Sequence, residues 1–130
     1  MLMKLRLHVK EFSVLDNNRI INIITNMNII VNEDTPHFAS WFAGAAKITH
    51  DHHVKMGYTQ LPQPKFTAIF GTRYVRIMRD GSAHAFIDRT NGDVLKPASW
   101  KAPAKHSRGN IFLSDNGLNC MGEYGPCYLR

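Results

Sequence analysis

Two dipeptides, Asp80-Gly81 and Asn91-Gly92, restrict the fold of this chain more than any other feature. Such pairs favour the two-residue turns of β-hairpins, because both central residues of those turns need a positive φ. Short runs rich in β-branched, aromatic and small residues flank the two pairs. The pattern predicts an antiparallel meander of four short strands over residues 66–70, 73–79, 83–89 and 93–96.

The register of the central hairpin follows from its turn. With a two-residue turn at Asp80-Gly81, Arg79 lies opposite Ser82, and regular alternation then places Ile77 opposite His84. Both faces of this hairpin carry an arginine and an aromatic residue. The sequence therefore leaves open which face is buried.

A helix is predicted upstream of the meander, over residues 34–57. Asp34 or Thr35 can cap it, and Pro36 suits its first turn. Because a lone meander cannot bury enough apolar surface, this helix must cover one of its faces. The expected fold class is α+β, with about four antiparallel strands packed by one amphipathic helix and a loop-rich C-terminal segment. The apolar residues at helical spacing are Phe38, Trp41, Phe42, Ala45 and Ile48.

The length of 130 residues fits a single domain. The meander takes residues 66–97, and dense Pro and Gly predict loops over residues 98–130. Residues 1–33 are rich in Asn and Ile and form either strands, at 5–9, 20–24 and 29–31, or a weakly packed extension. No apolar run reaches the ~20 residues that span a bilayer, and no signal peptide is apparent, so we expect a cytosolic protein without membrane contact.

The positive charge is concentrated in the second half of the chain. The net charge is +6, and residues 65–130 hold ten Lys and Arg against five acids. Cations beside an aromatic ring suit single-stranded nucleic acid or nucleotide phosphates, since they neutralise phosphates and offer a stacking platform. The alternative is that Trp100 caps the core while its lysines face water. The candidate binding residues are Arg73, Arg76, Lys96, Trp100, Lys101, Lys105, His106 and Arg108.

An enzymatic reading finds little support in the sequence. The histidines of residues 50–53 could belong to a metal-dependent hydrolase, but the HExxH pattern is absent, as are phosphate loops and nucleophile elbows. Cys120 and Cys127 cannot complete a zinc site alone, so we expect reduced thiols with a structural role. We expect no metal, no cofactor and no catalysis.

Several motifs resemble a family of small tailed-bacteriophage proteins that carry no assigned activity. They are HAFID (84–88), TNGDVLK (90–96), SWKAPAK (99–105), RGN (108–110) and YGPCYLR (124–130). The resemblance implies a phage origin and a host-cytoplasm setting, and supplies no catalytic residues. The functions that it leaves open are a nucleic-acid-binding accessory protein, an inhibitor that meets an acidic host or defence protein, and a minor virion or assembly protein.

Overall fold

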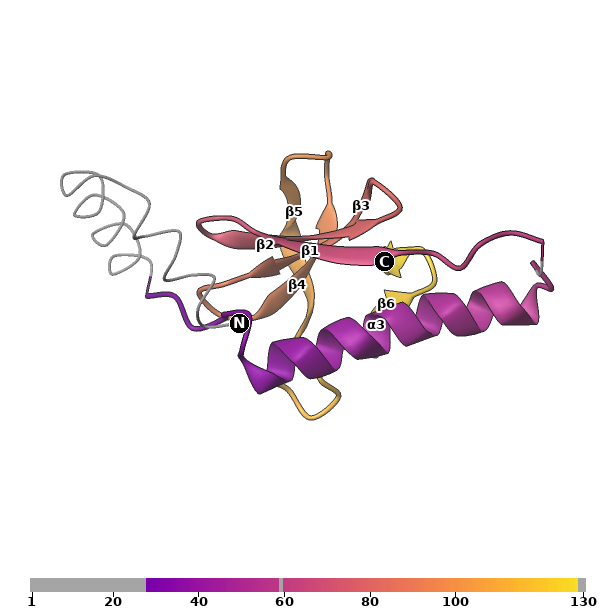
Figure 1. Cartoon of the computed structure of the whole chain (residues 1–130). Helices are drawn as coiled ribbons and strands as arrows, with labels where there is room; N and C mark the ends of the chain where they lie inside the picture. Colours follow the sequence, from indigo (N-terminus) through magenta and orange to yellow (C-terminus); the bar gives the residue numbers. More distant parts are fainter. Residues whose placement is uncertain (1–27, 59, 129–130) are drawn as a thin grey trace.

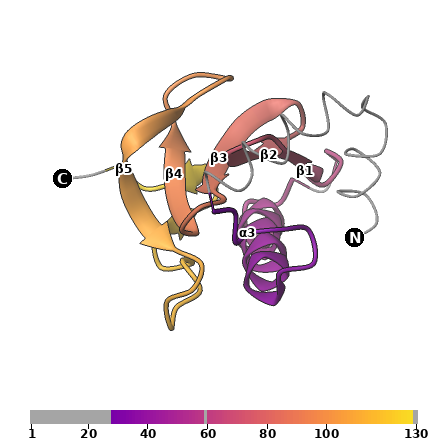
Figure 2. The same cartoon turned by 90° about the vertical axis from the view of Figure 1, so that its left-hand side faces the viewer.

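The computed structural model describes residues 28–58 and 60–128. In these residues the helix α3 (Pro36–Lys55) lies along one face of an antiparallel sheet (Figure 1, Figure 2). The expected α+β class is confirmed, but the sheet has five strands rather than four. Its order is β1 (Phe66–Phe70), β2 (Tyr74–Arg79), β3 (Ser82–Asp88), β4 (Asp93–Pro97) and β5 (Pro103–Asn110).

The two predicted turn dipeptides behave differently. Asp80 and Gly81 both have positive φ, 52° and 93°, as a two-residue hairpin turn requires. At the second dipeptide only Gly92 does, with a φ of 85°. That turn is longer, and the Asp88 carboxylate stabilises it by accepting hydrogen bonds from the backbone N–H and the hydroxyl of Thr90, at 2.9 and 2.6 Å.

The predicted register of the central hairpin is correct only near its turn. Arg79 pairs with Ser82, but Ile77 pairs with Ala85 instead of His84. His84 is the extra residue of a β-bulge, which shifts every later pair by one position. Alternation alone does not reveal such an insertion, because the residues on both sides of it keep a regular pattern.

Strand β5 occupies residues that the sequence analysis assigned to a loop. It pairs antiparallel with β4, and its register is irregular between Val94 and Pro97. Pro103 and Gly109 made this segment resemble a loop, yet both lie in the ladder, opposite Pro97 and Val94. Pairing with a single neighbour tolerates such residues, because an edge strand needs only half of its backbone groups for the sheet.

The core lies between α3 and the sheet. On the helix, Trp41 and Ala45 are buried, and on the sheet, Val75, Ile77 and Ile87 face them. In β2 the buried Val75 and Ile77 alternate with the less buried Tyr74 and Arg76, whereas in β3 both faces are buried, since Phe86 is 2% exposed. At the start of α3, Thr35 occupies the N-cap position but makes no side-chain capping bond.

A buried arginine holds the segment that precedes the helix. Arg89 is 4% exposed, and its guanidinium donates hydrogen bonds to the Val31 carbonyl, the Asn32 side chain and the Gly71 carbonyl. Burial lowers the pKa of Arg89. The strand expected at residues 29–31 is therefore wrong: this segment is irregular and bound to Arg89, whereas the strands expected at 5–9 and 20–24 lie outside the described residues.

A small hairpin of β6 (Met121–Gly122) and β7 (Gly125–Pro126) joins the helix to the sheet. The Thr49 hydroxyl of α3 donates a hydrogen bond to the Glu123 carbonyl, at 2.9 Å. On the other side, Gly125 approaches β3 so closely that an added Cβ would lie 2.5 Å from the His84 carbonyl oxygen. The hairpin thus contacts both layers of the fold.

Candidate nucleic-acid interface

The face of the sheet opposite α3 carries a row of polar and aromatic side chains. Since Val75 and Ile77 point to the core, alternation places Tyr74 and Arg76 of β2 on this outer face. Arg76 is paired with Ile69 on one side and with Phe86 on the other. The aliphatic part of the Arg76 side chain therefore begins between two apolar neighbours. Among the described residues no acidic side chain forms an ion pair with it.

The turn between β4 and β5 brings an aromatic ring to this arginine. Figure 1 shows this hairpin extending beyond the sheet on the side away from α3. The Ser99 hydroxyl accepts hydrogen bonds from the backbone N–H groups of Lys101 and Ala102, which fixes the turn. Trp100 lies at the turn, and its ring centroid is 4.1 Å from the Arg76 guanidinium carbon. This is a close cation–π contact, yet Trp100 stays 50% exposed.

A shallow hollow of about 160 Å³ adjoins this contact. Its volume is below the ~300 Å³ at which small-molecule pockets usually begin, so it suits one phosphate or one base rather than an enclosed cofactor. Lys101 lines it from the β4–β5 turn. We call the side chains that converge here the outer cluster: Arg73, Tyr74, Arg76, Trp100 and Lys101.

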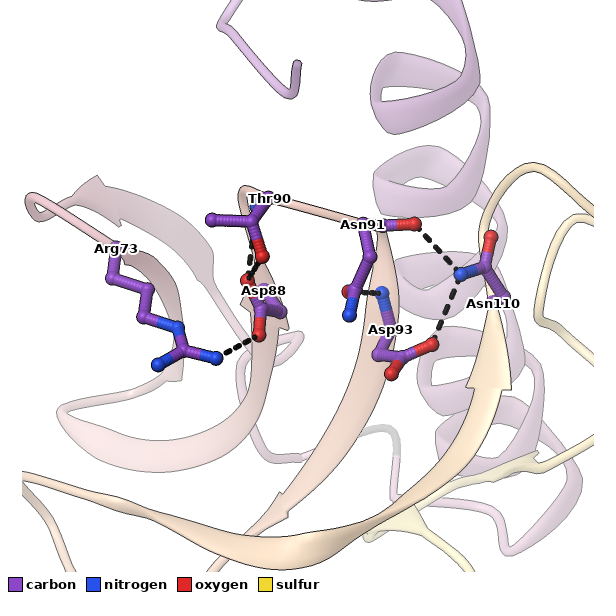
Figure 3. A network of polar contacts seen from close by, with 6 residues as sticks. All are labelled: Arg73, Asp88, Thr90, Asn91, Asp93 and Asn110. Atoms are coloured by element: carbon purple, nitrogen blue, oxygen red, sulfur yellow. Dashed lines mark hydrogen bonds and ion pairs between the residues drawn. The ribbon is translucent and has the colours of Figure 1, made fainter. Parts of the chain in front are cut away.

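Within residues 28–58 and 60–128, Arg73 is the one cation of the outer cluster with an acidic partner. Its Nη2 lies 3.1 Å from an oxygen of the buried Asp88 carboxylate (Figure 3). This hydrogen bond, together with the charge of Asp88, raises the pKa of Arg73. The other Asp88 oxygen is taken by Thr90, so the carboxylate is fully used within the protein. A bound anion would have to share Arg73 with Asp88.

A second group of polar contacts lies beside this pair at the same end of the sheet. The Asn110 amide donates hydrogen bonds to the Asn91 carbonyl and to the Asp93 carboxylate, at 2.8 and 3.0 Å (Figure 3). These bonds connect the β3–β4 turn to the end of β5. They fix the strand ends and use the Asn110 side-chain amide for contacts within the protein.

Two predicted binding residues have structural partners instead. The Lys96 ammonium donates a hydrogen bond to the Pro126 carbonyl and lies 4.0 Å from the ring centroid of Tyr128. Arg108 donates to the Cys127 carbonyl at 2.8 Å. Both cations thus donate to backbone carbonyls of the segment that contains β7 and connect this segment to the sheet. The sequence could not separate them from the outer cluster, since their acceptors are backbone carbonyls.

The remaining predicted residues, Lys105 and His106, are exposed on β5. Tyr74 belongs to the outer cluster although it was not among the predicted residues. Its ring lies 5.3 Å from the Arg73 guanidinium carbon and 6.2 Å from the Phe86 ring. The available signal was its position two residues before Arg76, which puts both on one face of a strand.

The histidines near the end of α3 support the chain that follows. His50 Nε2 lies 2.7 Å from the Pro64 carbonyl, and His53 Nε2 lies 3.2 Å from the Leu61 carbonyl. Each ring can therefore donate an N–H to the connector between α3 and β1. Within residues 28–58 and 60–128, no group of three or more metal-binding side chains comes together.

The described part of the chain has no helix long and apolar enough to cross a membrane. Comparison with curated proteins and with solved structures finds no match to this chain. A family model, by contrast, matches residues 14–125, which include α3, the whole sheet and most of the β6–β7 hairpin. Because this match spans most of the sequence, the chain belongs to DUF7717, a family of unknown function.

Proposed function

We propose that this protein is a small, non-enzymatic accessory protein that binds single-stranded nucleic acid through the outer cluster. The observation that carries the proposal is the Arg76 guanidinium stacked on the half-exposed ring of Trp100, with Lys101 beside them. Bases of a single strand are free to stack on an aromatic ring, whereas duplex bases are not. The phosphates that flank such a base meet Arg76 and Lys101.

The resemblance to tailed-phage proteins supports the setting of this role. Residues 66–130, which carry the resemblance, also contain β2, the β4–β5 turn and therefore the whole outer cluster. We propose that the protein acts in the cytoplasm of an infected host cell, where phage and host single strands are present.

Binding of a fluorescently labelled oligo-dT, followed by anisotropy, tests the proposal. Arg76→Ala and Lys101→Ala should each weaken binding about tenfold, because each removes a charge from the stacking site. Lys55→Ala is the matched control: it removes the same charge from the exposed end of α3, on the other side of the molecule. It should leave the affinity within a factor of two.

Salt dependence gives a second readout. Each phosphate contact on a single strand contributes about −0.7 to the slope of log affinity against log salt. Lys101→Ala should therefore make the slope shallower by about 0.7, whereas Lys55→Ala should not change it. Equal effects of both variants would show diffuse charge attraction and contradict a defined site.

Absence of oligonucleotide binding by the wild-type protein would overturn the proposal. It would favour the other functions considered for the sequence, an inhibitor that meets an acidic host protein or a minor virion protein. Stoichiometric co-purification of one acidic host protein distinguishes the first of these. Detection of the chain in purified particles distinguishes the second.

A further inference from the structure

The two cysteines of the chain face each other across the β6–β7 hairpin. In this ladder Met121 pairs with Pro126 and Gly122 with Gly125. The next facing pair is Cys120 and Cys127, and the Cys127 N–H donates a hydrogen bond to the Cys120 carbonyl at 2.8 Å. This is one of the two N–H···O bonds that a hydrogen-bonded facing pair exchanges, and it places Cys120 and Cys127 opposite each other at the end of the ladder.

Directly opposed residues of an antiparallel pair place their side chains on the same side of the ladder. In hydrogen-bonded pairs the Cα atoms are about 5.5 Å apart, which lies within the roughly 4.4–6.8 Å that disulfides span. We propose that Cys120 and Cys127, which are free thiols in this structure, form a reversible intramolecular disulfide across the hairpin.

The environments of the two thiols indicate which of them reacts first with an oxidant. Cys127 is exposed, whereas Cys120 is 9% exposed and its Sγ donates a hydrogen bond to the Gly117 carbonyl. Burial raises the pKa of the Cys120 thiol to about 11, so little of it is thiolate near neutral pH and it reacts slowly with an oxidant in solution. Its attack on a mixed disulfide at Cys127 is intramolecular, which compensates for the low thiolate fraction. Cys127 is therefore the thiol that meets an external oxidant.

The oxidant that we propose is a low-molecular-weight disulfide such as oxidised glutathione. The Cys127 thiolate attacks one sulfur of this disulfide, forms a mixed disulfide and releases one molecule of the reduced thiol. Cys120 then loses its proton and attacks Cys127 Sγ, which forms the protein disulfide and releases the second reduced thiol. Two protein thiols are oxidised and one external disulfide is reduced.

The place of this bridge in the fold gives it a structural consequence. The hairpin receives a hydrogen bond from Thr49 of α3, and the Pro126 and Cys127 carbonyls accept bonds from Lys96 and Arg108 of the sheet. A disulfide between Cys120 and Cys127 would hold closed the hairpin that joins the two layers. This inference is independent of the outer cluster and of nucleic-acid binding.

Mass spectrometry of the full-length protein tests the pairing. Protein equilibrated with excess oxidised glutathione is blocked with iodoacetamide and digested with trypsin. The peptide of residues 109–130 contains both cysteines and no internal Lys or Arg. We expect it to be two hydrogen atoms lighter than the reduced peptide, with no glutathione and no carbamidomethyl group.

Two single variants test the order of reaction. Cys120→Ser should accumulate glutathione on Cys127, because the resolving thiol is gone. Cys127→Ser should keep Cys120 reduced after the same treatment. Circular dichroism of both variants, compared with the wild type, establishes that each is folded. The wild-type Tm should rise on oxidation and return to its starting value with dithiothreitol.

The proposal is overturned by wild-type protein that retains glutathione on Cys127 as fully as Cys120→Ser does. It is equally overturned by disulfide-linked dimers in place of the internal bridge, or by thiols that stay reduced at every glutathione ratio.

Discussion

His84 is an ionisable side chain enclosed by the fold. It is 3% exposed, its ring lies 5.0 Å from that of Phe66, and its Nε2 has no hydrogen-bond partner among the described residues. Burial, with the charges of Arg79 and Lys96, lowers the pKa of His84 from 6.5 to about 4. At neutral pH His84 is therefore an uncharged ring held in the bulge of β3.

This shift predicts a loss of stability in mild acid. Between pH 6.5 and 4 the unfolded chain binds a proton at His84 that the folded chain does not. The contribution of His84 to the free energy of unfolding should therefore be constant above pH 6.5. It should fall by about 3 kcal/mol as the pH drops from 6.5 towards 4.

His84→Gln should remove this part of the pH dependence. Urea unfolding followed by circular dichroism at pH 7 and pH 4.5 measures it for both proteins. The comparison uses the difference between the two pH values, so any loss of stability that Gln itself causes does not affect the outcome. Equal differences in the two proteins would contradict the prediction.

Trp100 is the residue whose replacement best separates binding from folding. It is half exposed, and its main contact is Arg76, so removal of the ring should cost little stability. Stacking on an aromatic residue contributes roughly 1–3 kcal/mol per base, and Trp100→Ala should therefore weaken oligo-dT binding about tenfold or more. Trp100→Phe should keep most of the affinity because it retains a ring.

Oligonucleotide anisotropy measures both Trp100 variants, and thermal unfolding serves as the control for folding. If Trp100→Ala binds as tightly as the wild type, the ring is not part of the binding site.

At the level of elements, the short hairpin β6–β7 depends on a glycine in close contact with β3. Gly125 has a φ of 113°, and a Cβ added there would lie 2.5 Å from the His84 carbonyl oxygen. Gly81 is a matched comparison, since its φ is 93° but no heavy atom lies within 4 Å of such a Cβ.

Gly81→Ala should cost about 1–2 kcal/mol, because a positive φ is unfavourable for a residue with a Cβ. Gly125→Ala should cost more than Gly81→Ala, since β7 or β3 must also move. Urea unfolding of the two variants and the wild type measures the difference. A Gly125→Ala loss no greater than that of Gly81→Ala would show that the close approach relaxes without cost.

The elements that could be predicted are those with local signals. The Asp80-Gly81 turn identifies the central hairpin, and Pro36 marks the start of the helix, because both depend on the φ of nearby residues. The bulge at His84 and the strand β5 could not be predicted, since each is determined by pairing with a neighbouring strand. Local propensity carries no information on such a partner.

For the whole molecule, the candidate site depends on which face of the sheet the helix covers. The sequence predicted a group of basic binding residues around Trp100, but it could not distinguish those on the outer face from those that hold the β7 segment. Arg76 and Lys101 lie on the face opposite α3, whereas Lys96 and Arg108 bind the segment that contains β7. This division follows from the packing of residues that are distant in sequence, so it required the structure.

The sheet order leaves β1 and β5 as the two edge strands, and their sequences differ in character. Strand β5 combines Pro103, Lys105 and Arg108, and prolines and charges on an edge discourage pairing with other molecules. Strand β1, with the sequence FTAIF, has no charge and alternating exposed positions, one of which is Thr67.

At high concentration, self-association should therefore begin at β1 rather than at β5. Thr67→Lys should raise the concentration at which light scattering appears, and Thr67→Val should lower it, with little effect of either on the fold. An increase in aggregation with Thr67→Lys would contradict this. If the two variants behave as expected, the uncharged edge strand β1, rather than the basic outer face, determines the solubility of this protein.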